Sequence, residues 1–493
     1  MRPLFFCTGF GYFQQVRLRL TVLIFTLVLT SCPSGPRETL IATPQVSIDL
    51  PELRTQGVLR ALVDNNSVSY FIYKGRSMGF EYELLQNLAA YLNLQLKIKV
   101  ISGVEEAINQ LNKGDGDLIA FPLTITKERK KYVQFTRPLF QTSQVLVQRK
   151  PENWRTNPDL AERAMVRDPA DLIGREVHVL AGSSFATRLR NLSEEVGGEI
   201  LVREDSADAE TEALIKRVST GAIDFTVTDQ TLAMVNAAYY SNLDVKTLVS
   251  LPQQIAWAAR TNSPQLAASI NTWLSQSKKS GYFKIIYDKY FNSPRTVIIR
   301  GTSDYSSITG RKLSPWDDEI KKGAAQLGWD WRLLGAVIYT ESNFKTDATS
   351  WAGAQGLMQL MPETAEQFGA TDPNDPIQSI RAGVKFIQFL DAQLAKTIDD
   401  PNERLKFVLA SYNVGITHVI DARNLTKKYG GNPRLWDNHV AYYLLQKSKP
   451  EFYRNPVAAG GYCRCEGPIH YVQEVIGRFE EYKIHLPEAT LTD

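Results

Sequence analysis

The 493-residue chain has little cysteine and histidine and almost no net charge. It contains four Cys and five His, and 53 acidic residues nearly balance its 56 basic ones. Cys463 and Cys465 lie near His470 but lack an evident fourth ligand, which argues against a zinc site. A bond between these two thiols would close a small, strained ring, so we expect no disulfide there. The balanced charge offers no basic surface for nucleic acid. We therefore expect no metal, no cofactor and no nucleic-acid partner.

Long apolar runs are also missing. The apolar stretch at residues 20–29 is too short to span a bilayer and follows Arg17 and Arg19, which is typical of a signal peptide. The sequence L-T-S-C at 29–32 resembles a bacterial lipobox. That resemblance implies a signal peptide at 1–32, a lipid on Cys32 and a tether at 33–50. The alternative is a conventional signal peptide with an incidental Cys.

What the chain does have is a carboxylate in an apolar setting. The run L-L-G-A-V-I-Y at 333–339 predicts a helix, and Glu341 follows Ile338 by three residues and Val337 by four, on its apolar face. Asn343 is a suitable stop, so Glu341 lies at the negative end of the helix. Burial and the helix dipole both raise the pKa of a carboxyl group. A carboxyl group protonated near neutral pH is what a general acid for a glycosidic oxygen requires.

Three motif blocks surround this carboxylate. They read E-S-N-F at 341–344, A-T-S-W-A-G-A-Q-G-L-M-Q-L-M-P at 348–362 and Y-N-V-G at 412–415. In order and spacing they resemble the lytic transglycosylase family of peptidoglycan-cleaving enzymes. The resemblance implies an all-α, lysozyme-like domain at 314–486 with Glu341 as the single catalytic carboxylate. Glu341 would protonate the oxygen between N-acetylmuramic acid and N-acetylglucosamine, then take the proton of the muramyl C6 hydroxyl as a 1,6-anhydro ring closes. Such an enzyme is a lyase.

The same resemblance assigns further residues to the substrate. Two polar residues are expected to contact the sugar or steady Glu341, and three to line the cleft: Ser350 and Gln359, then Tyr412, Asn413 and Tyr471.

One block departs from the family pattern, which is E-x-x-x-Y-V. Here the sequence is G-P-I-H-Y-V at 467–472, and Glu466 comes one place too early. Whether Glu466 replaces the missing acid is left open. For Met358 and Met361 we expect plain core filling.

In the first half of the chain, strands alternate with helices over residues 51–295. Predicted strands at 58–63 and 96–100 flank an amphipathic helix that ends near Leu92, so we expect βαβ units and a mainly parallel sheet. The chain then reads G-D-G-D-L-I at 114–119, T-I-T-K-E-R at 124–129 and F-T-R-P at 135–138. These blocks resemble the polar amino-acid family of periplasmic solute-binding proteins, which implies a two-lobed α/β domain.

In that family the ligand lies between the two lobes. The resemblance implies that Thr124, Arg129 and Ser183 or Ser184 hold a carboxylate and that Asp229 holds an ammonium group. The fork of an Arg meets a carboxylate with two hydrogen bonds, and free amides at 183 and 184 would form a helix-start anion site. The alternatives are that Arg129 is a surface charge and Asp229 a helix cap.

Residues 296–313 turn polar, which predicts a linker between the two domains. The combined resemblance implies a peptidoglycan lyase, lipid-anchored at the periplasmic face of the outer membrane. Its solute-binding domain would sense an amino acid or muropeptide and regulate cleavage. Two alternatives are a solute receptor whose second domain grips glycan without cleaving it, and a lysozyme-like hydrolase that uses Asp347 as a second carboxylate.

Overall fold

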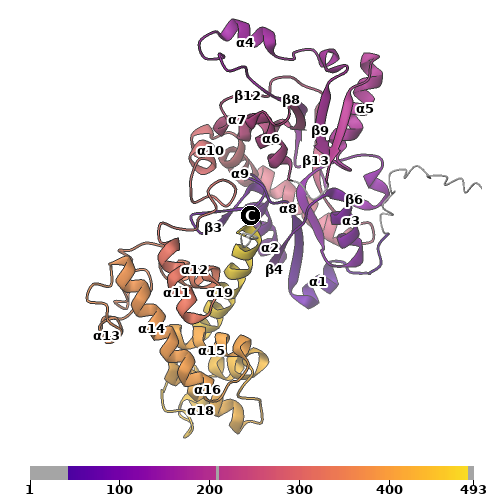
Figure 1. Ribbon diagram of the computed structural model, residues 1–493. Coiled ribbons are helices and arrows are strands. Elements are labelled where there is room, and N and C mark those ends of the chain that lie inside the picture. The colour runs from indigo at the N-terminus through magenta and orange to yellow at the C-terminus, as the bar shows by residue number, and fades with distance from the viewer. Residues whose placement is uncertain (1–42, 207–209, 487–493) are drawn as a thin grey trace, which may run out of the picture. The chain divides into compact units, whose positions relative to one another are not determined.

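The computed structural model describes residues 43–206 and 210–486 (Figure 1). Cys32, the predicted signal peptide and most of the predicted tether lie outside these residues. Within the described ranges, no helix is both long enough and apolar enough to cross a membrane.

The last residues of the predicted tether belong to the first domain. Asp49 caps helix α1 (Leu50–Gln56) by accepting a hydrogen bond from the Leu50 amide, and Glu52 completes the capping box. The Gln45 amide donates to the Asn112 carbonyl at 2.8 Å. Ile48 packs on the domain core, in which Leu50 is buried. The tether boundary at residue 50 was therefore placed too late, because these apolar side chains are buried.

The first lobe is built on a mixed sheet with the order β4-β1-β5-β13-β6, and β7 also pairs with β13. Its strands are β1 (Val58–Val63), β4 (Gln95–Val100), β5 (Leu118–Thr124), β6 (Val133–Phe135), β7 (Phe140–Thr142) and β13 (Gln253–Arg260). Strand β1 runs parallel to β4 and β5, as expected from the βαβ pattern. Strand β13 is antiparallel to β5, β6 and β7, so the prediction of a mainly parallel sheet was wrong in this half.

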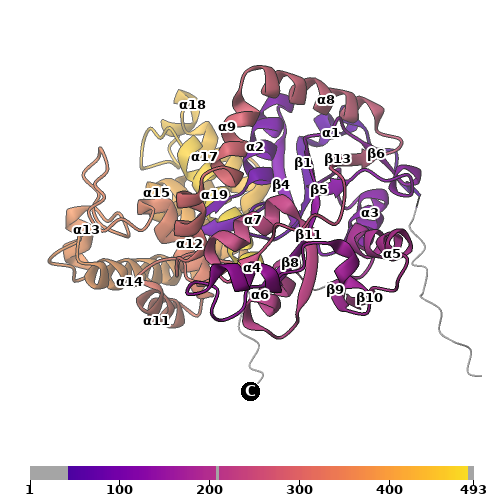
Figure 2. The ribbon, with the colours of Figure 1, turned by 90° about the horizontal axis from the view of Figure 1, so that it is seen from above.

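Helices cover both faces of this sheet. They are α2 (Phe80–Leu92), α3 (Val104–Lys113), α8 (Pro264–Lys279) and α9 (Tyr282–Phe291), and a small hairpin consists of β2 (Phe71–Tyr73) and β3 (Arg76–Met78). Successive residues of β1 point to opposite faces of the sheet and so contact different helices, as strand geometry requires. Ala61 packs in the cluster formed by α2 and α8, whereas Leu62 packs with α3. Figure 2 shows α8 and α3 on opposite sides of β1 and β5.

The second lobe has a sheet with the order β10-β9-β11-β8-β12. Its strands are β8 (Gln144–Arg149), β9 (Glu176–Leu180), β10 (Leu201–Asp205), β11 (Phe225–Asp229) and β12 (Leu243–Asp244), and its helices are α4 (Pro158–Ala164), α5 (Ser184–Val196), α6 (Thr211–Thr220) and α7 (Gln230–Tyr239). The chain enters this lobe after β7 and leaves it before β13. The two-lobed α/β fold expected from the sequence is therefore present.

The predicted linker begins as a helix. Helix α10 (Pro294–Gly301) includes residues 296–301 of the predicted linker, and Val297 and Arg300 of this helix are buried. Residues 305–307 then pair with the hairpin strand β2, since the Ser307 amide donates to the Ile72 carbonyl at 2.9 Å. The polar composition of 301–307 marked a connection. Its amides at 302, 303 and 306 donate to carbonyls three or four residues back, and only its end is held by β2.

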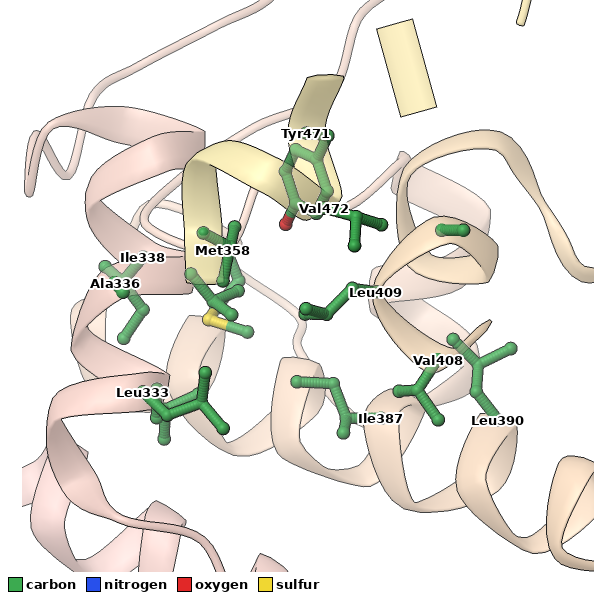
Figure 3. Packing of buried hydrophobic residues seen from close by; sticks show 14 of the residues in the cluster. Leu333, Ala336, Ile338, Met358, Ile387, Leu390, Val408, Leu409, Tyr471 and Val472 are labelled. Atoms are coloured by element: carbon green, nitrogen blue, oxygen red, sulfur yellow. The ribbon is translucent and has the colours of Figure 1, made fainter. Parts of the chain in front are cut away.

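The C-terminal domain is helical. It comprises α11 (Asp317–Leu327), α12 (Trp331–Ser342), α13 (Pro362–Gln367), α14 (Pro376–Ala395), α15 (Pro401–Val414), α16 (Ile416–Lys428), a π-helical turn at Trp436–Val440, α17 (Ala441–Gln446), α18 (Pro450–Tyr453) and α19 (Glu466–His485). Helix α12 lies at its centre, because residues 333–338 of α12 are all buried. Figure 3 shows Leu333 and Ile338 of α12 facing Ile387, Val408 and Leu409 of the neighbouring helices.

Candidate active site and ligand cavity

Glu341 lies in the last turn of α12, where the sequence places it. The helix ends at Ser342, and Asn343 adopts a left-handed conformation with φ of 52° while its amide donates to the Tyr339 carbonyl. The Glu341 side chain is partly buried. Burial raises the pKa of its carboxyl group to about 7, against an opposing hydrogen bond from Tyr471. Glu341 can therefore exist in both protonation states at neutral pH.

Two tyrosines from other helices complete this site. The hydroxyl of Tyr471, on α19, donates to Oε1 of Glu341 at 2.6 Å. The hydroxyl of Tyr412, on α15, donates to the Met358 carbonyl at 2.6 Å. Burial raises the pKa of both phenols, and the charge of Glu341 raises it further, so each ring lies in the field of that carboxylate. Both phenols are thus neutral donors beside Glu341.

Ser350 and Gln359 brace the loop that follows α12. The Ser350 hydroxyl accepts a hydrogen bond from the Ala354 amide at 3.0 Å, across a turn in which Gly353 has φ of 92°. The Gln359 side-chain amide donates to the carbonyls of Ala348 and Gly356, both at 2.9 Å. These bonds stabilise the loop, and among the residues that the structure describes no donor is hydrogen-bonded to the Gln359 side-chain oxygen.

The remaining residues predicted for this domain differ in exposure. Asn413 and Asp347 are exposed. Glu466 is the first residue of α19, with its side chain exposed and 3.9 Å from Arg464. In the part of the chain that the structure describes, it makes no contact with the Glu341–Tyr471 pair. Met358 is fully buried as expected, but Met361 is 41% exposed, so its assignment to the core was wrong.

Cys463 and Cys465 are joined by a disulfide, contrary to the sequence-based expectation. Their Cα atoms are 5.2 Å apart, within the range that a disulfide spans. The disulfide lies just before α19 begins, and Cys465 is the N-cap residue of that helix. Within residues 43–206 and 210–486, no three His, Cys, Asp or Glu side chains are placed to hold a metal ion.

In the first domain, the residues predicted to bind a ligand line one cavity of about 130 Å³. Thr124 and Arg129 come from the first lobe, and Ser183, Ser184 and Asp229 come from the second. Residues from four separate segments, at 124, 129, 183–184 and 229, therefore meet at one place between the lobes.

Arg129 is held inside this cavity. Its Nη1 donates to the Thr124 carbonyl at 3.1 Å, and its amide donates to the Thr126 hydroxyl. Burial lowers the pKa of its guanidinium group to about 10, against the opposing charge of Asp229. It differs from its neighbours Lys127 and Lys130, which are exposed, so it is not simply one more surface charge.

Asp229 is the last residue of β11 and occupies the N-cap position of α7, but its side chain makes no capping bond. Its Oδ1 is buried and has no hydrogen-bond partner among the described residues. Burial raises the pKa of this carboxyl group to about 7, although the charge of Arg129 opposes the shift. A helix cap does not account for such a group, whereas a bound cation would satisfy it.

Ser183 and Ser184 offer fewer free hydrogen-bonding groups to a ligand than expected. The Ser183 amide donates to the Leu180 carbonyl at 3.2 Å, so it is not the free amide that the sequence suggested. Its hydroxyl caps α5 by accepting from the Ala186 amide. The Ser184 hydroxyl accepts from the Gln144 side chain at 3.2 Å. The Ser183 groups thus stabilise the turn between β9 and α5, and the Ser184 hydroxyl connects that turn to Gln144 on β8.

Sequence reasoning missed two acidic residues of the same cavity, Asp64 and Glu210. Burial raises the pKa of Asp64 to about 6, and nearby Glu212 and Glu210 raise it further. Burial also raises the pKa of Glu210. Asp64 directly follows β1, and ligands of α/β folds bind at the carboxyl ends of strands, so its position could have revealed it. Glu210 offered no such signal.

Comparison with known proteins also divides the chain into an N-terminal and a C-terminal domain. The family described as bacterial extracellular solute-binding proteins, family 3, matches residues 59–293, and the transglycosylase SLT domain matches residues 318–434. A membrane-bound lytic murein transglycosylase F from Desulfosudis oleivorans is 32% identical over 88% of this chain and 91% of its own length. Proteins of the same name from Pseudomonas fluorescens and Stutzerimonas stutzeri are each 31% identical, over 86% and 91% of this chain and 85% and 87% of their own lengths.

Proposed function

The chain belongs to the membrane-bound lytic murein transglycosylase F family, and we propose that Glu341 is the acid and base of its reaction. It is a lytic transglycosylase, a lyase that acts on peptidoglycan, with an amino-acid-binding type of domain at its N-terminal side. The observation that carries the assignment is the partly buried Glu341, with a raised pKa and a hydrogen bond from Tyr471. The proposed catalytic domain comprises residues 314–486.

The proposed reaction needs one carboxyl group. Protonated Glu341 gives its proton to the glycosidic oxygen between N-acetylmuramic acid and N-acetylglucosamine, and that bond breaks. The Tyr471 hydroxyl then stabilises the carboxylate that is formed. Glu341 takes the proton of the C6 hydroxyl of the same muramyl residue as this oxygen bonds to the anomeric carbon. The substrate supplies the nucleophile, so the exposed Asp347 and Glu466 are not required.

Around this carboxylate, the remaining residues hold the sugar. Tyr412, Asn413 and Tyr471 line the cleft, and Ser350 and Gln359 keep the facing loop in shape while the Gln359 oxygen accepts from the glycan.

The nature of the products tests this mechanism. Intramolecular capture yields anhydromuropeptides, which have one water less than the products of a hydrolase. We expect mass spectrometry of digested murein to show anhydromuramyl ends. A majority of reducing muramyl ends would instead identify a hydrolase. Release of no fragments at all would favour a receptor that only grips glycan.

The first domain, at proposed residues 51–295, binds an amino acid or muropeptide. Arg129 and Thr124 take the carboxylate, Ser183 and Ser184 border it, and Asp229 takes the ammonium group. The described cavity of about 130 Å³ is comparable to cavities that hold one small molecule, which favours a single amino acid over a long peptide. Asp64 and Glu210 accept hydrogen bonds from the Asn66 and Asn65 side chains but receive no ligand group in these pairings. A second ammonium group in the ligand, as in a diamino acid, therefore fits best.

The protein is associated with the membrane, as the names of its relatives state for them. For its attachment we propose a lipid on Cys32 that holds it at the periplasmic face of the outer membrane. Fusion of the two domains through residues 296–313 further suggests that the ligand regulates cleavage. A coupling free energy typical of allostery, about 1–3 kcal/mol, would change the rate of murein release several-fold or more when ligand is added. Equal rates at every ligand concentration would make the domains independent.

A further inference from the structure

An aromatic cluster lies on the C-terminal domain outside its core. It consists of Tyr429, Tyr442, Tyr443 and Phe452, which we call the tyrosine face. The rings of Tyr429 and Tyr443 are stacked, with centroids 5.5 Å apart and planes at 7°. Phe452 lies 5.8 Å from Tyr429 and 6.1 Å from Tyr443, and Tyr442 meets Tyr443 edge-on at 5.1 Å. The four rings therefore form one continuous group.

This group does not stabilise the main core. None of its members belongs to the core cluster of the domain or packs against it in the described structure. Tyr429 is 49% exposed and Tyr442 is 51% exposed. Leu435 and Leu445, which lie close to these residues in the sequence, are also exposed. Exposed apolar surface that is gathered in one place, rather than scattered, indicates a surface for binding.

Hydrogen bonds keep the tyrosine face in position. Nζ of Lys428 donates to Oδ1 of Asn455 at 2.9 Å, and the Asn455 amide donates to the Tyr429 hydroxyl at 3.5 Å. These bonds connect the end of α16 to the segment that follows α18. Figure 1 shows α16 and α18 together at one end of the helical domain. The rings are thus presented as a fixed platform.

The surroundings of this platform are basic. Between residues 427 and 464, six basic residues are exposed and only two acidic ones, Asp437 and Glu451. The basic residues are Lys427, Lys428, Arg434, Lys449, Arg454 and Arg464. Asp437 is paired with Lys406 at 2.6 Å, Arg434 lies 3.4 Å from Asp399, and Arg464 lies 3.9 Å from Glu466. Lys427, Lys428, Lys449 and Arg454 then outnumber Glu451, so the local charge is positive. The charge of the whole chain, in contrast, is nearly balanced at +3. A ligand for this surface should combine apolar faces with negative charge.

We propose that the tyrosine face is a second peptidoglycan-binding surface, separate from the group formed by Glu341, Tyr412 and Tyr471. The C–H faces of the sugar rings lie on the aromatic platform, and the free carboxylates of the stem peptides pair with the surrounding Lys and Arg side chains. Tyr442, Tyr443 and Phe452 lie beyond residue 434, where the match to the transglycosylase SLT domain ends. The inference rests on the proposed function in that it takes peptidoglycan as the substrate. Its role is to hold the polymer while Glu341 cleaves it.

Binding to insoluble murein tests the proposal directly. In the full chain carrying Glu341→Gln, which leaves murein uncut, we expect Tyr429→Ala with Tyr442→Ala to weaken co-sedimentation with purified sacculi about tenfold, as for the loss of interface anchors. The matched control is Tyr91→Ala, a tyrosine that is 45% exposed on α2. In the active protein, Tyr429→Ala with Tyr442→Ala should lower the rate of cleavage of dilute sacculi by a similar factor. The rate of cleavage of a short soluble muropeptide glycan should be unchanged.

A second double variant separates a loss of binding from a loss of folding. Lys449→Gln with Arg454→Gln removes only exposed charge, so it should keep the thermal midpoint and weaken binding to sacculi most strongly at low salt. Unchanged binding in both variants would overturn the proposal. Loss of binding to vesicles of phosphatidylethanolamine and phosphatidylglycerol, with sacculus binding intact, would also overturn it and identify a membrane-facing surface. If the parent protein neither sediments with sacculi nor releases fragments, the proposed function itself fails.

Discussion

The hydroxyl of Tyr471 donates a 2.6 Å hydrogen bond to Oε1 of Glu341. Burial of Glu341 favours its neutral form and this bond favours its charged form, and the net result is a pKa of about 7. A group that must first give a proton and then take one benefits from a pKa near the working pH. Tyr471 therefore acts on the reaction by setting the balance between the two forms.

Tyr471→Phe removes the bond that favours the charged form, so the pKa of Glu341 should rise. The reaction starts from protonated Glu341, and kcat/KM should fall about tenfold per pH unit above the pKa of that group. In the variant this fall should begin at higher pH than in the parent. At pH 6 the rate should be about tenfold or more lower, because a hydrogen bond to the developing charge is lost. A pH profile from 5 to 9 measures both, and Tyr453→Phe is the control. A descending limb that stays in place or moves to lower pH would contradict the role assigned to Tyr471.

Glu341→Gln should lower murein release by 10²-fold or more, the order of effect expected for the loss of a general acid. The fold should survive, because Gln has nearly the same shape and still accepts the bond from Tyr471. Asp347→Asn is the matched variant. Asp347 is exposed in the loop after α12, and we expect near-normal release from it. Equal loss in the two variants would point to a two-carboxylate hydrolase.

The sequence was sufficient for the position of Glu341 but not for its partner. The apolar period of α12 and the stop at Asn343 are local signals, and the structure confirms both. Tyr471 lies 130 residues further along the chain, so its contact with Glu341 depends on how α19 packs against α12. The last motif block departs from the family pattern at its acid but keeps the tyrosine, so it predicted Tyr471 as a cleft residue without indicating the hydrogen bond.

For the cavity of the first domain, too, the sequence indicated residues but not the contacts that they make. Motif blocks identified Arg129 and Asp229, but an Asp at the start of a helix usually caps it, and only packing shows that this one does not. Strand β13 pairs with β5 from 131–141 residues away in the sequence, which the local βαβ pattern could not indicate. Helix α10 was missed because its start overlaps the end of the predicted domain and a polar stretch, T-S-D-Y-S-S at 302–307, follows it directly.

Arg129→Ala should abolish binding of amino acids to the first domain, since it removes the cation that meets the carboxylate.

Asp64→Asn should weaken the binding of only some amino acids. At pH 8, above the pKa of about 6 of Asp64 and of about 7 of Asp229, both carboxyl groups are charged. Calorimetry should then show that Asp64→Asn weakens lysine or ornithine about tenfold or more, as for one lost charged hydrogen bond, and leaves glutamine nearly unchanged. Equal weakening of all ligands would remove the second ammonium site from the proposal.

Cys32→Ala tests the anchor. Residue 32 lies outside the described residues, and the expectation rests on the lipobox alone. The variant should lose incorporation of labelled lipid and should either remain unprocessed or move to the soluble fraction, because a single lipid anchor would be gone. Cys463→Ala is a suitable control, since that cysteine is in a disulfide. A Cys32→Ala protein that remains with the membranes after a salt wash would require a second attachment.

Glu81 is fully buried in the first turn of α2, and burial raises the pKa of its carboxyl group to about 8 from an ordinary value of 4.5. Between these values the folded chain keeps a proton on Glu81 that the unfolded chain has released. The free energy of unfolding therefore decreases as pH rises through this window, by at most about 1.4 kcal/mol per pH unit from this group. Glu81→Gln keeps the shape and removes the titration, so its stability relative to the parent should rise steadily from pH 5 to pH 8. Urea unfolding of both proteins across this range measures the difference, with the exposed Glu194→Gln as control. Parallel curves for parent and Glu81→Gln would mean that Glu81 is charged in the folded protein and that burial does not govern it.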